Sequence, residues 1–249
     1  MFADYYDRLT ANIDYRARAE YFNDIAVRFG GKKNGILLDL ACGTGSLSAE
    51  FARMGYDVIG TDASPDMLNI AISKKSPDLP DIQFLCQEMT ALDMFGTIDI
   101  TVCALDSLNH LPDVDSIKRT VEKVSLFTEP GGLFIFDMNT PYKHRHALRD
   151  NVYIYETEDV YCVWRSILDE ASADNRTDIS LDFFERTKNV YRRYSEDFSE
   201  IAPDNDTIVK ILADAGFELL AEYEGDTFSA PREDTERIVR AARKPMKGK

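Results

Sequence analysis

The stretch that decides the fold is Ile36-Leu37-Leu38-Asp39-Leu40-Ala41-Cys42-Gly43-Thr44-Gly45. Its apolar half is typical of a buried strand, and its second half is a small turn punctuated by two glycines. A second apolar run, Val58-Ile59-Gly60-Thr61, follows and ends at Asp62. The order is therefore strand, tight turn, helix and a second strand tipped by a carboxylate, which is the opening unit of a doubly wound sheet.

Strands and helices keep alternating beyond this unit. We expect strands at 82–86, 98–103 and 133–137, a turn at 129–132, and helices at 46–54, from 65 onward, at 113–127 and at 204–215. Ser64 and Pro65 mark a helix start, because serine caps free amides and proline suits the first helical position. The run Gly216-Phe217-Glu218-Leu219-Leu220 and a last strand near 237–243 complete a seven-stranded, mostly parallel α/β sheet with helices on both faces. Residues 1–30 predict a helix that stops at Gly30-Gly31.

The pattern changes within residues 151–200. Aromatic-rich, partly alternating runs such as Tyr161-Cys162-Val163-Trp164 are separated by polar turns there. Such runs favour antiparallel strands over further strand–helix units. We therefore expect one Rossmann-like domain made of residues 1–150 and 201–249, with an antiparallel β insertion at 151–200 that serves as a lid and acceptor subdomain.

Composition limits the partners. The chain has 249 residues, 44% of them hydrophobic, and a formal net charge of −15, so a packed core is expected and nucleic acid is an unfavourable partner. A local basic patch would still suffice for a small RNA. The four cysteines are widely spaced and form no CxxC pair, which argues against zinc or a disulfide framework. We find no signal peptide and no membrane-length apolar run, and we expect a cytoplasmic protein.

The glycine turn predicts a nucleoside ligand. In a doubly wound sheet such a turn lets the backbone approach the ligand, and a carboxylate such as Asp62 accepts from ribose hydroxyls. Ser48 stands where a dinucleotide fingerprint has its third glycine, which weakens the case for NAD. Asp39, at the end of the first strand, is placed to orient the turn and to meet a cationic part of the ligand.

The run LLDLACGTG, followed by Asp62, resembles motif I and the next acidic position of class I S-adenosylmethionine-dependent methyltransferases. Further similar segments are 86–92, where Glu88 stands in place of the more usual Asp, 98–111 and 130–134. The resemblance implies S-adenosyl-L-methionine as the cofactor. It also implies that the cofactor is bound by Tyr6, Asp39, Gly43, Thr44, Gly45, Asp62, Ala63, Met67, Glu88, Met89 and Leu105.

The tyrosine-rich start and the β insertion resemble a bacterial subgroup of small methyltransferases in which both segments cover the cofactor. That resemblance makes Tyr6 and Tyr15 candidates for a lid over the methionine end. The alternative is that both tyrosines simply pack on the core from an amphipathic helix.

The loop after the fourth strand narrows the chemistry. Ala104-Leu105-Asp106-Ser107 lacks the proline pair of enzymes that methylate amide or adenine nitrogens. A metal-dependent alternative would use Asp106, Asp137 and Asn139, although we expect no metal. His110 is the candidate general base, since imidazole titrates near neutrality; the alternative is a solvated or helix-capping histidine.

We place the methyl acceptor against Asp106, Asn109, Trp164, Tyr194 and Glu196. Glu196 would meet an amine, or would instead be a surface charge, and the aromatic residues would either wall a pocket or form a satellite core. The predicted enzyme transfers a methyl group to a small molecule by in-line displacement, and is a monomer or homodimer. The alternatives are a tRNA methyltransferase and an S-adenosylmethionine-binding protein without activity.

Overall fold

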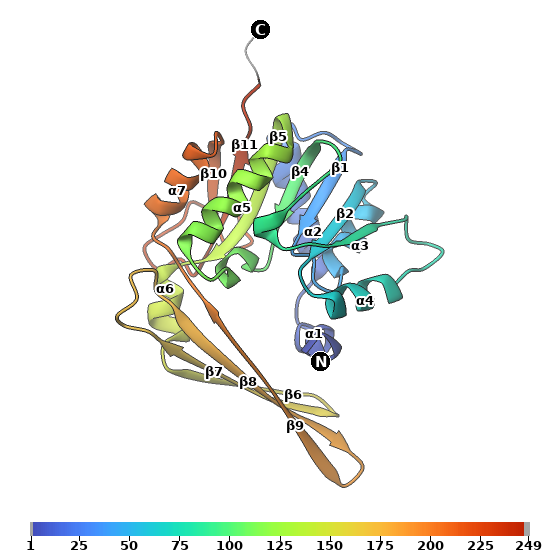
Figure 1. The fold of residues 1–249 in the computed structure, drawn as a ribbon, viewed down its shortest axis with the longest axis vertical. Helices are drawn as coiled ribbons and strands as arrows, with labels where there is room; N and C mark the ends of the chain where they lie inside the picture. The colour runs from blue at the N-terminus through green and yellow to red at the C-terminus, as the bar shows by residue number, and fades with distance from the viewer. Residues whose placement is uncertain (1, 247–249) are drawn as a thin grey trace.

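The computed structural model describes residues 2–246 and contains two separate sheets (Figure 1). The strands of the larger sheet are β1 (Ile36–Leu40), β2 (Asp57–Asp62), β3 (Gln83–Cys86), β4 (Ile98–Cys103), β5 (Thr128–Asn139), β10 (Glu218–Glu224) and β11 (Arg237–Arg243). They lie in the order β10-β11-β5-β4-β1-β2-β3, and β11 is antiparallel to both of its neighbours. The predicted seven-stranded, mostly parallel sheet is confirmed, and its order reverses between β1 and β4, where such sheets bind ligands.

Helices cover both faces of this sheet. On one side α2 (Tyr15–Arg28) and α3 (Ser46–Arg53) share a core with Leu37 of β1. On the other side α5 (Val114–Phe127) and α7 (Asn205–Asp214) share a core with Leu38. Successive strand residues point to opposite faces, so one apolar run supplies both cores. The helix α4 (Pro65–Ser73) packs against β2 and β3, and Ser64 accepts from the Met67 amide as the predicted cap.

The prediction of one continuous helix over residues 1–30 is wrong. The segment consists of α1 (Phe2–Leu9) and α2, which a short turn separates. Asp14 begins the second helix by accepting from the Ala17 amide. A capping carboxylate competes with helix continuation because it binds the amides that the preceding carbonyls would otherwise take.

The turn predicted at 129–132 is part of strand β5. The pairing of β4 with β5 runs from Ile98–Thr128 directly to Ile100–Leu133, so the extra residues bulge out of the ladder. Gly131 has φ +88°, and its amide donates to the Lys244 carbonyl. Pro130, Gly131 and Gly132 therefore form a bulge within a long strand instead of a separate turn.

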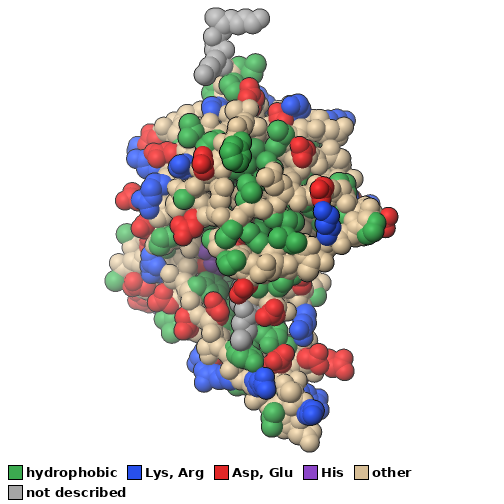
Figure 2. Space-filling view, turned by 45° about the vertical axis from the view of Figure 1, so that its right-hand side comes forward, with side chains coloured by type: hydrophobic (Ala, Val, Ile, Leu, Met, Phe, Trp, Pro, Cys, Tyr) green, Lys and Arg blue, Asp and Glu red, His purple; other side chains and the backbone are tan. Residues whose placement is uncertain are grey.

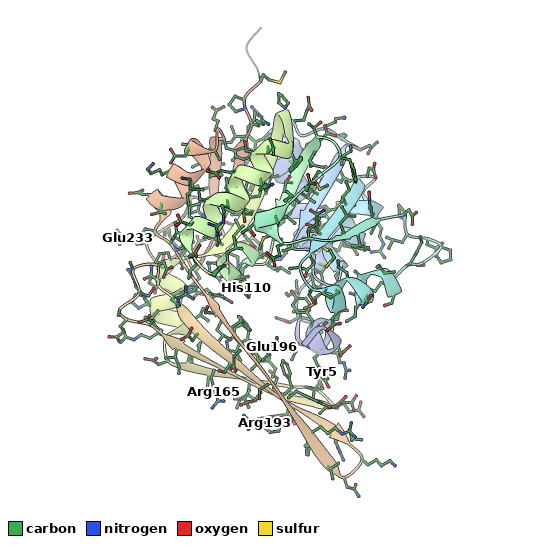
Figure 3. The ribbon with its side chains drawn as sticks, viewed as in Figure 1. Tyr5, His110, Arg165, Arg193, Glu196 and Glu233 are labelled. Atoms are coloured by element: carbon green, nitrogen blue, oxygen red, sulfur yellow. The ribbon has the colours of Figure 1, made fainter. Side chains whose placement is uncertain are left out.

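The smaller sheet is the predicted antiparallel insertion. Its strands are β6 (Asn151–Glu156), β7 (Val160–Leu168), β8 (Thr177–Thr187) and β9 (Val190–Glu200), paired in that order. One face carries Leu181, opposite Glu196, and is turned toward the larger sheet; Arg165 and Arg193 lie on the other face (Figure 3). The strands follow α6 (Pro141–Lys143) and the π-helical turn η3 (His144–Leu148).

Helix α1 joins the two sheets. Tyr5 stacks on Phe183 of β8, with ring centroids 5.4 Å apart, and is buried in the small core of the second sheet. Asp7, on the same helix, accepts from the Thr44 hydroxyl in the turn after β1 and pairs with Lys74 at the end of α4. The helix is therefore attached to both parts of the molecule.

Charges are mixed over the surface. On the face drawn in Figure 2, acidic and basic side chains are interspersed, without a continuous basic area. The formal net charge is −15. None of the described helices is long and apolar enough to cross a membrane.

Candidate active site

The turn after β1 and the end of β2 form one hydrogen-bonded unit. The carboxylate of Asp62 accepts from the Gly43 amide at 2.9 Å and from the Ser64 amide at 2.8 Å. Gly43 has φ +55°, a conformation that glycine adopts without strain. An added Cβ there would find nothing nearer than the Tyr6 ring, 4.0 Å away. The backbone therefore leaves open space between the turn and Tyr6.

That open space belongs to a cleft of about 720 Å³ at the carboxyl ends of the strands. Its lining includes the predicted cofactor residues Tyr6, Gly43, Asp62, Ala63, Met67, Glu88, Met89 and Leu105, together with His110. A smaller, adjoining recess is lined by Asp39, Thr44 and Tyr15, and it shares Tyr6, Gly43 and Leu105 with the cleft. Ten of the eleven predicted cofactor residues thus lie around one continuous depression.

Gly45 is the residue that this depression leaves out. It has φ +72°, and an added Cβ would lie 2.9 Å from both Ala71 and the ring of Phe84. Gly45 therefore allows α3 to begin close against α4 and β3, behind the turn rather than in front of it. Its role in the structure is packing.

Asp39 lies beneath the turn and is buried. Its carboxylate accepts from the Ser48 hydroxyl. Burial raises the pKa of Asp39 to about 6, because the charged form loses its hydration, and the Ser48 hydrogen bonds only partly offset this effect. A cationic group in the recess would stabilise the ionised form of Asp39. The carboxylate therefore suits the amino group of a cofactor.

The two tyrosines predicted as a lid both line the recess. Tyr6 and Tyr15 are hydrogen-bonded to each other, and Tyr15 also donates to Thr10. Burial raises the pKa of Tyr6 far above its ordinary value, so its phenol stays neutral. The tyrosines therefore add hydrogen-bonding groups and rings, but no charge, to the lining of the recess.

Together these residues suit S-adenosylmethionine. Asp62 would accept from ribose hydroxyls, Glu88 and Met89 would border the base, and Asp39 would face the amino-acid end. The cofactor supplies a methyl group on a positively charged sulfur, which is a good leaving group. The chain itself supplies the alignment and the exclusion of water.

Two predicted metal-ligand candidates contact arginines. Asp106 pairs with Arg237 at 2.7 Å, and Asp137 pairs with Arg237 at 2.9 Å and with Arg18 at 3.1 Å. The third candidate, Asn139, donates to Asp106. Guanidiniums therefore neutralise the carboxylates from inside the protein, which makes a divalent-ion site at these three residues unfavourable.

His110 lies at the end of the cleft that faces the second sheet (Figure 3). It belongs to the 3-10 turn η2 (Ser107–His110) after β4, and its ring lies 5.2 Å from that of Phe198 on β9. Its Nε2 is 3.7 Å from a carboxylate oxygen of Glu200. The candidate base is thus next to both the cofactor cleft and the insertion.

Asn109 is placed differently from the prediction. Its side chain is fully buried, donates to the carbonyls of Asn139 and Ile201, and accepts from the Asn139 amide. All of its amide atoms are engaged by backbone, so it ties β5 to the segment after β9 instead of facing an acceptor. This use of a loop asparagine is not visible in a local pattern.

The insertion residues Trp164, Tyr194 and Glu196 lie on the face of the small sheet that is turned toward the larger one. Trp164 and Tyr194 are half-buried against the core that contains Tyr5. Glu196 is exposed and points into the space between the sheets (Figure 3). The aromatics thus contribute to a satellite core, while the glutamate stays accessible from the acceptor side.

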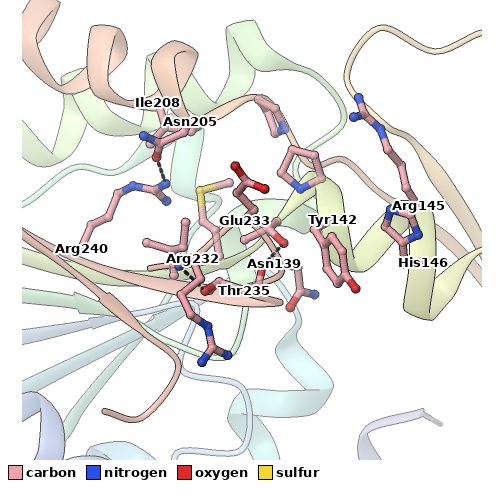
Figure 4. A pocket seen from close by; sticks show the side chains of 15 residues that line it. Asn139, Tyr142, Arg145, His146, Asn205, Ile208, Arg232, Glu233, Thr235 and Arg240 are labelled. Atoms are coloured by element: carbon pink, nitrogen blue, oxygen red, sulfur yellow. Dashed lines mark hydrogen bonds between the residues drawn. The ribbon is translucent and has the colours of Figure 1, made fainter. Parts of the chain in front are cut away.

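A second cavity, of about 320 Å³, is lined by the end of β5 and by residues of α7 and β11 (Figure 4). Arg232 and Arg240 are among the residues that line this cavity. Arg240 pairs with Glu222 and also donates to Asn205, whereas Arg232 pairs with Glu224 and Asp234. With both guanidiniums already matched by neighbours, this cavity is a weaker candidate than the cleft at Asp62.

Three residues at the site were missed by the sequence reasoning: Glu200, His144 and Arg237. Glu200 is the last residue of β9, and its side chain is only 3% exposed. His144 belongs to a short segment that also contains Arg145 and Arg149, yet it is completely buried. A histidine and a glutamate near the ends of the insertion were the available signal, but their partners lie far away in the chain.

Comparisons with known proteins agree with this geometry. A family model described as "Methyltransferase domain" matches residues 37–132. The chain is 30% identical over 244 residues to a putative methyltransferase of Geobacillus sp. (strain WCH70). The aligned region covers 98% of each chain. The crystal structure of an S-adenosylmethionine-dependent methyltransferase from Clostridium acetobutylicum ATCC 824 matches with a TM-score of 0.88 and 29% identity, over 98% of each chain.

A more distant likeness concerns the fold alone. The sugar N-methyltransferase KedS8 from Streptoalloteichus sp ATCC 53650 has a TM-score of 0.77 and 20% identity, over 98% of this chain and 92% of that one. The likeness thus extends along nearly the full length of this chain. By its sequence relatives, its fold and the residues around its cleft, the chain belongs to the methyltransferase family and is a class I S-adenosylmethionine-dependent enzyme.

Proposed function

We propose that this enzyme methylates a small molecule that binds between its two sheets. The observation that carries the proposal is the position of His110, which lines the cofactor cleft and contacts Phe198 of the insertion. The methyl group would therefore leave the cofactor at the boundary with the second sheet. A β-rich lid over this boundary suits an enclosed small molecule better than a long polymer.

We further propose His110 as the general base for acceptors that arrive protonated. The acceptor atom would attack the methyl carbon from the side opposite the sulfur, while its proton passes to the imidazole. Asp62 and the turn at Gly43 would hold the cofactor in line, and the insertion would exclude water. Trp164, Tyr194 and Glu196 would border the acceptor.

Several broader properties support the same proposal. The net charge of −15 and the mixed surface charges disfavour RNA, since nucleic-acid binding draws on clustered basic residues. All four cysteines are free thiols, as expected of a protein in a reducing cytoplasm. We propose a cytoplasmic enzyme that acts as a monomer or homodimer.

The decisive experiment incubates the purified protein with S-adenosylmethionine and a metabolite extract. We expect S-adenosylhomocysteine to form and one extract component to gain the mass of a methylene group. Asp62→Ala should abolish the product, whereas Asp57→Ala, at the exposed opposite end of β2, should not. Cofactor binding without any product would favour a sensor, and methylation of a tRNA fraction alone would contradict the small-molecule acceptor.

A further inference from the structure

Three polar side chains gather beside His110: Asp106 from the same loop, and His144 and Glu200 from segments far away in the chain. Ligand atoms of Asp106, His110 and Glu200 all lie within 4.8 Å of one another. His144 lies behind them, with its Nε2 3.7 Å from Glu200 Oε2, while the other glutamate oxygen is 3.7 Å from His110 Nε2. Glu200 and His144 are both buried.

This cluster is short of hydrogen-bond donors. His144 Nδ1 lies 2.8 Å from the Asn175 carbonyl, so that nitrogen must carry the ring proton. Its Nε2 is therefore an acceptor, and it has no hydrogen-bond partner among the described residues although it is buried. Burial lowers the pKa of His144 to about 4, which keeps the ring neutral. A buried acceptor that faces a carboxylate indicates a missing donor.

The neighbouring cations do not fill this need. Arg237 binds Asp106, and Lys143 donates to the side-chain oxygen of Asn139. The amide nitrogen of Asn139 donates to Asp106 at 2.8 Å but lies 3.4 Å from Glu200, which is a long hydrogen bond. Burial raises the pKa of Glu200, an effect that nearby Asp106 adds to and His110 and Lys143 oppose. Two resident cations make a divalent metal ion unfavourable, but a singly charged or neutral donor remains acceptable.

An amino group matches the geometry. One nitrogen can lie at about 2.9 Å from both atoms of a pair that are 3.7 Å apart, as His110 Nε2 and Glu200 Oε1 are. An ammonium group brings three donors and a charge, whereas a hydroxyl brings one donor and a carboxylate none. We propose that Asp106, His110 and Glu200, backed by His144, form a subsite for the amino group of the acceptor, which makes the substrate a small amine.

This inference rests on the proposed function and specifies its acceptor. An ammonium that enters the subsite gives one N–H proton to His110 Nε2, which frees the nitrogen lone pair. The lone pair forms the new N–C bond as the C–S bond breaks, and the bonding pair stays on sulfur as a neutral thioether. The positive charge thus moves from sulfur to the methylated nitrogen, and no further reactant is needed.

The test uses the three histidines of the chain as reporters. The full-length protein, saturated with S-adenosylhomocysteine and labelled in its histidine rings, is titrated with methylammonium chloride by NMR. We expect saturable shifts of the His110 and His144 signals but not of His146. Methanol and sodium chloride, at matched concentrations, should leave all three unchanged.

Variants assign the effect to the cluster. Glu200→Gln should weaken methylammonium binding by about ten-fold or more, since it removes the charge that holds the ammonium. Asp197→Asn, on the opposite face of the same strand, is the matched control and should bind as the parent does. The inference is overturned if methylammonium gives no saturable shift, if Glu200→Gln binds it equally well, or if Mg²⁺ or Zn²⁺ saturates the cluster in its place.

A second arm uses catalysis and separates this inference from the proposed function. The metabolite extract is treated with an N-acetylating reagent before the methylation assay, which blocks primary and secondary amines. Loss of product supports the amine subsite. Unchanged product would overturn the subsite while leaving small-molecule methylation intact, and an untreated extract that yields no product would count against the proposed function alone, with the titration still deciding the subsite.

Discussion

The cofactor side, around Gly43 and Asp62, and the proposed acceptor side, around His110 and Glu200, are built in different ways. On the cofactor side the key contacts are local: Asp62 binds Gly43 across 19 positions, and Asp39 binds Ser48 across nine. On the acceptor side they are remote, as between Asn139 and Glu200, 61 positions apart, or Asn109 and Ile201, 92 apart. The first kind of site is encoded in turns, whereas the second exists only after the insertion has docked.

The largest effect should come from Asn109→Ala. Each lost hydrogen bond leaves a buried backbone group unpaired at about 1–3 kcal/mol, so we expect destabilisation of about 4 kcal/mol in urea unfolding. Because the broken contacts lie on the acceptor side, affinity for S-adenosylhomocysteine in the variant that remains folded should be nearly normal. If the folded variant also binds S-adenosylhomocysteine much more weakly than the parent, the contrast between the two sides is contradicted.

Asp62→Ala tests the cofactor side. It removes the predicted ribose contacts and the anchor of the Gly43 and Ser64 amides, so affinity for S-adenosylhomocysteine should fall about 100-fold or more, which is about 2.7 kcal/mol. Isothermal titration calorimetry measures the change. Asp57→Ala serves as the control, and an unchanged dissociation constant for Asp62→Ala would contradict the placement of the cofactor.

Gly45→Ala separates packing from binding within the turn. The new Cβ meets Ala71 and Phe84 at 2.9 Å and must accept φ +72°, which together cost about 2 kcal/mol. Gly96→Ala, where no atom lies within 4 Å, should leave unfolding unchanged. If Gly45→Ala instead weakens cofactor binding at unchanged stability, Gly45 belongs to the cleft after all.

The last effect depends on pH and disappears in acid. The pKa of Asp39 is raised from 3.8 to about 6, so its stabilising contribution is complete below about pH 4 and is lost as the pH rises through about 6. Without cofactor, Asp39→Asn should therefore be more stable than the parent at pH 8, by up to about 3 kcal/mol, and no more stable at pH 4. Thermal unfolding at both pH values measures this, and a gain that persists at pH 4 would exclude ionisation as its cause.

These contrasts explain what could be predicted from the sequence. The alternation of strands and helices, the cap at Ser64 and the residues around Gly43 and Asp62 followed from short patterns, because their interactions are made within one or two elements. The break between α1 and α2, and the bulge inside β5, were missed because helix periodicity and turn residues do not reveal competing caps or strand pairing.

The acceptor side could not be predicted in the same way. Burial of His144 depends on contacts with Asn175 and Thr177, and the environment of Glu200 depends on segments before and after the insertion. No spacing in the sequence specifies which of several histidines and glutamates will meet. Asn109 was correctly located near the site but misjudged in role, because its partners are backbone atoms of distant strands.

Helix α1 has a kinetic consequence. Tyr6 lines the cofactor cleft, while the adjacent Tyr5 is buried against the second sheet and Asp7 holds the glycine turn. A displacement of these two helical turns would therefore uncover the cofactor and loosen the lid in a single event. We expect departure of the spent cofactor and renewal of the acceptor to share one gate, so that turnover would be paced by how often an eight-residue helix lifts.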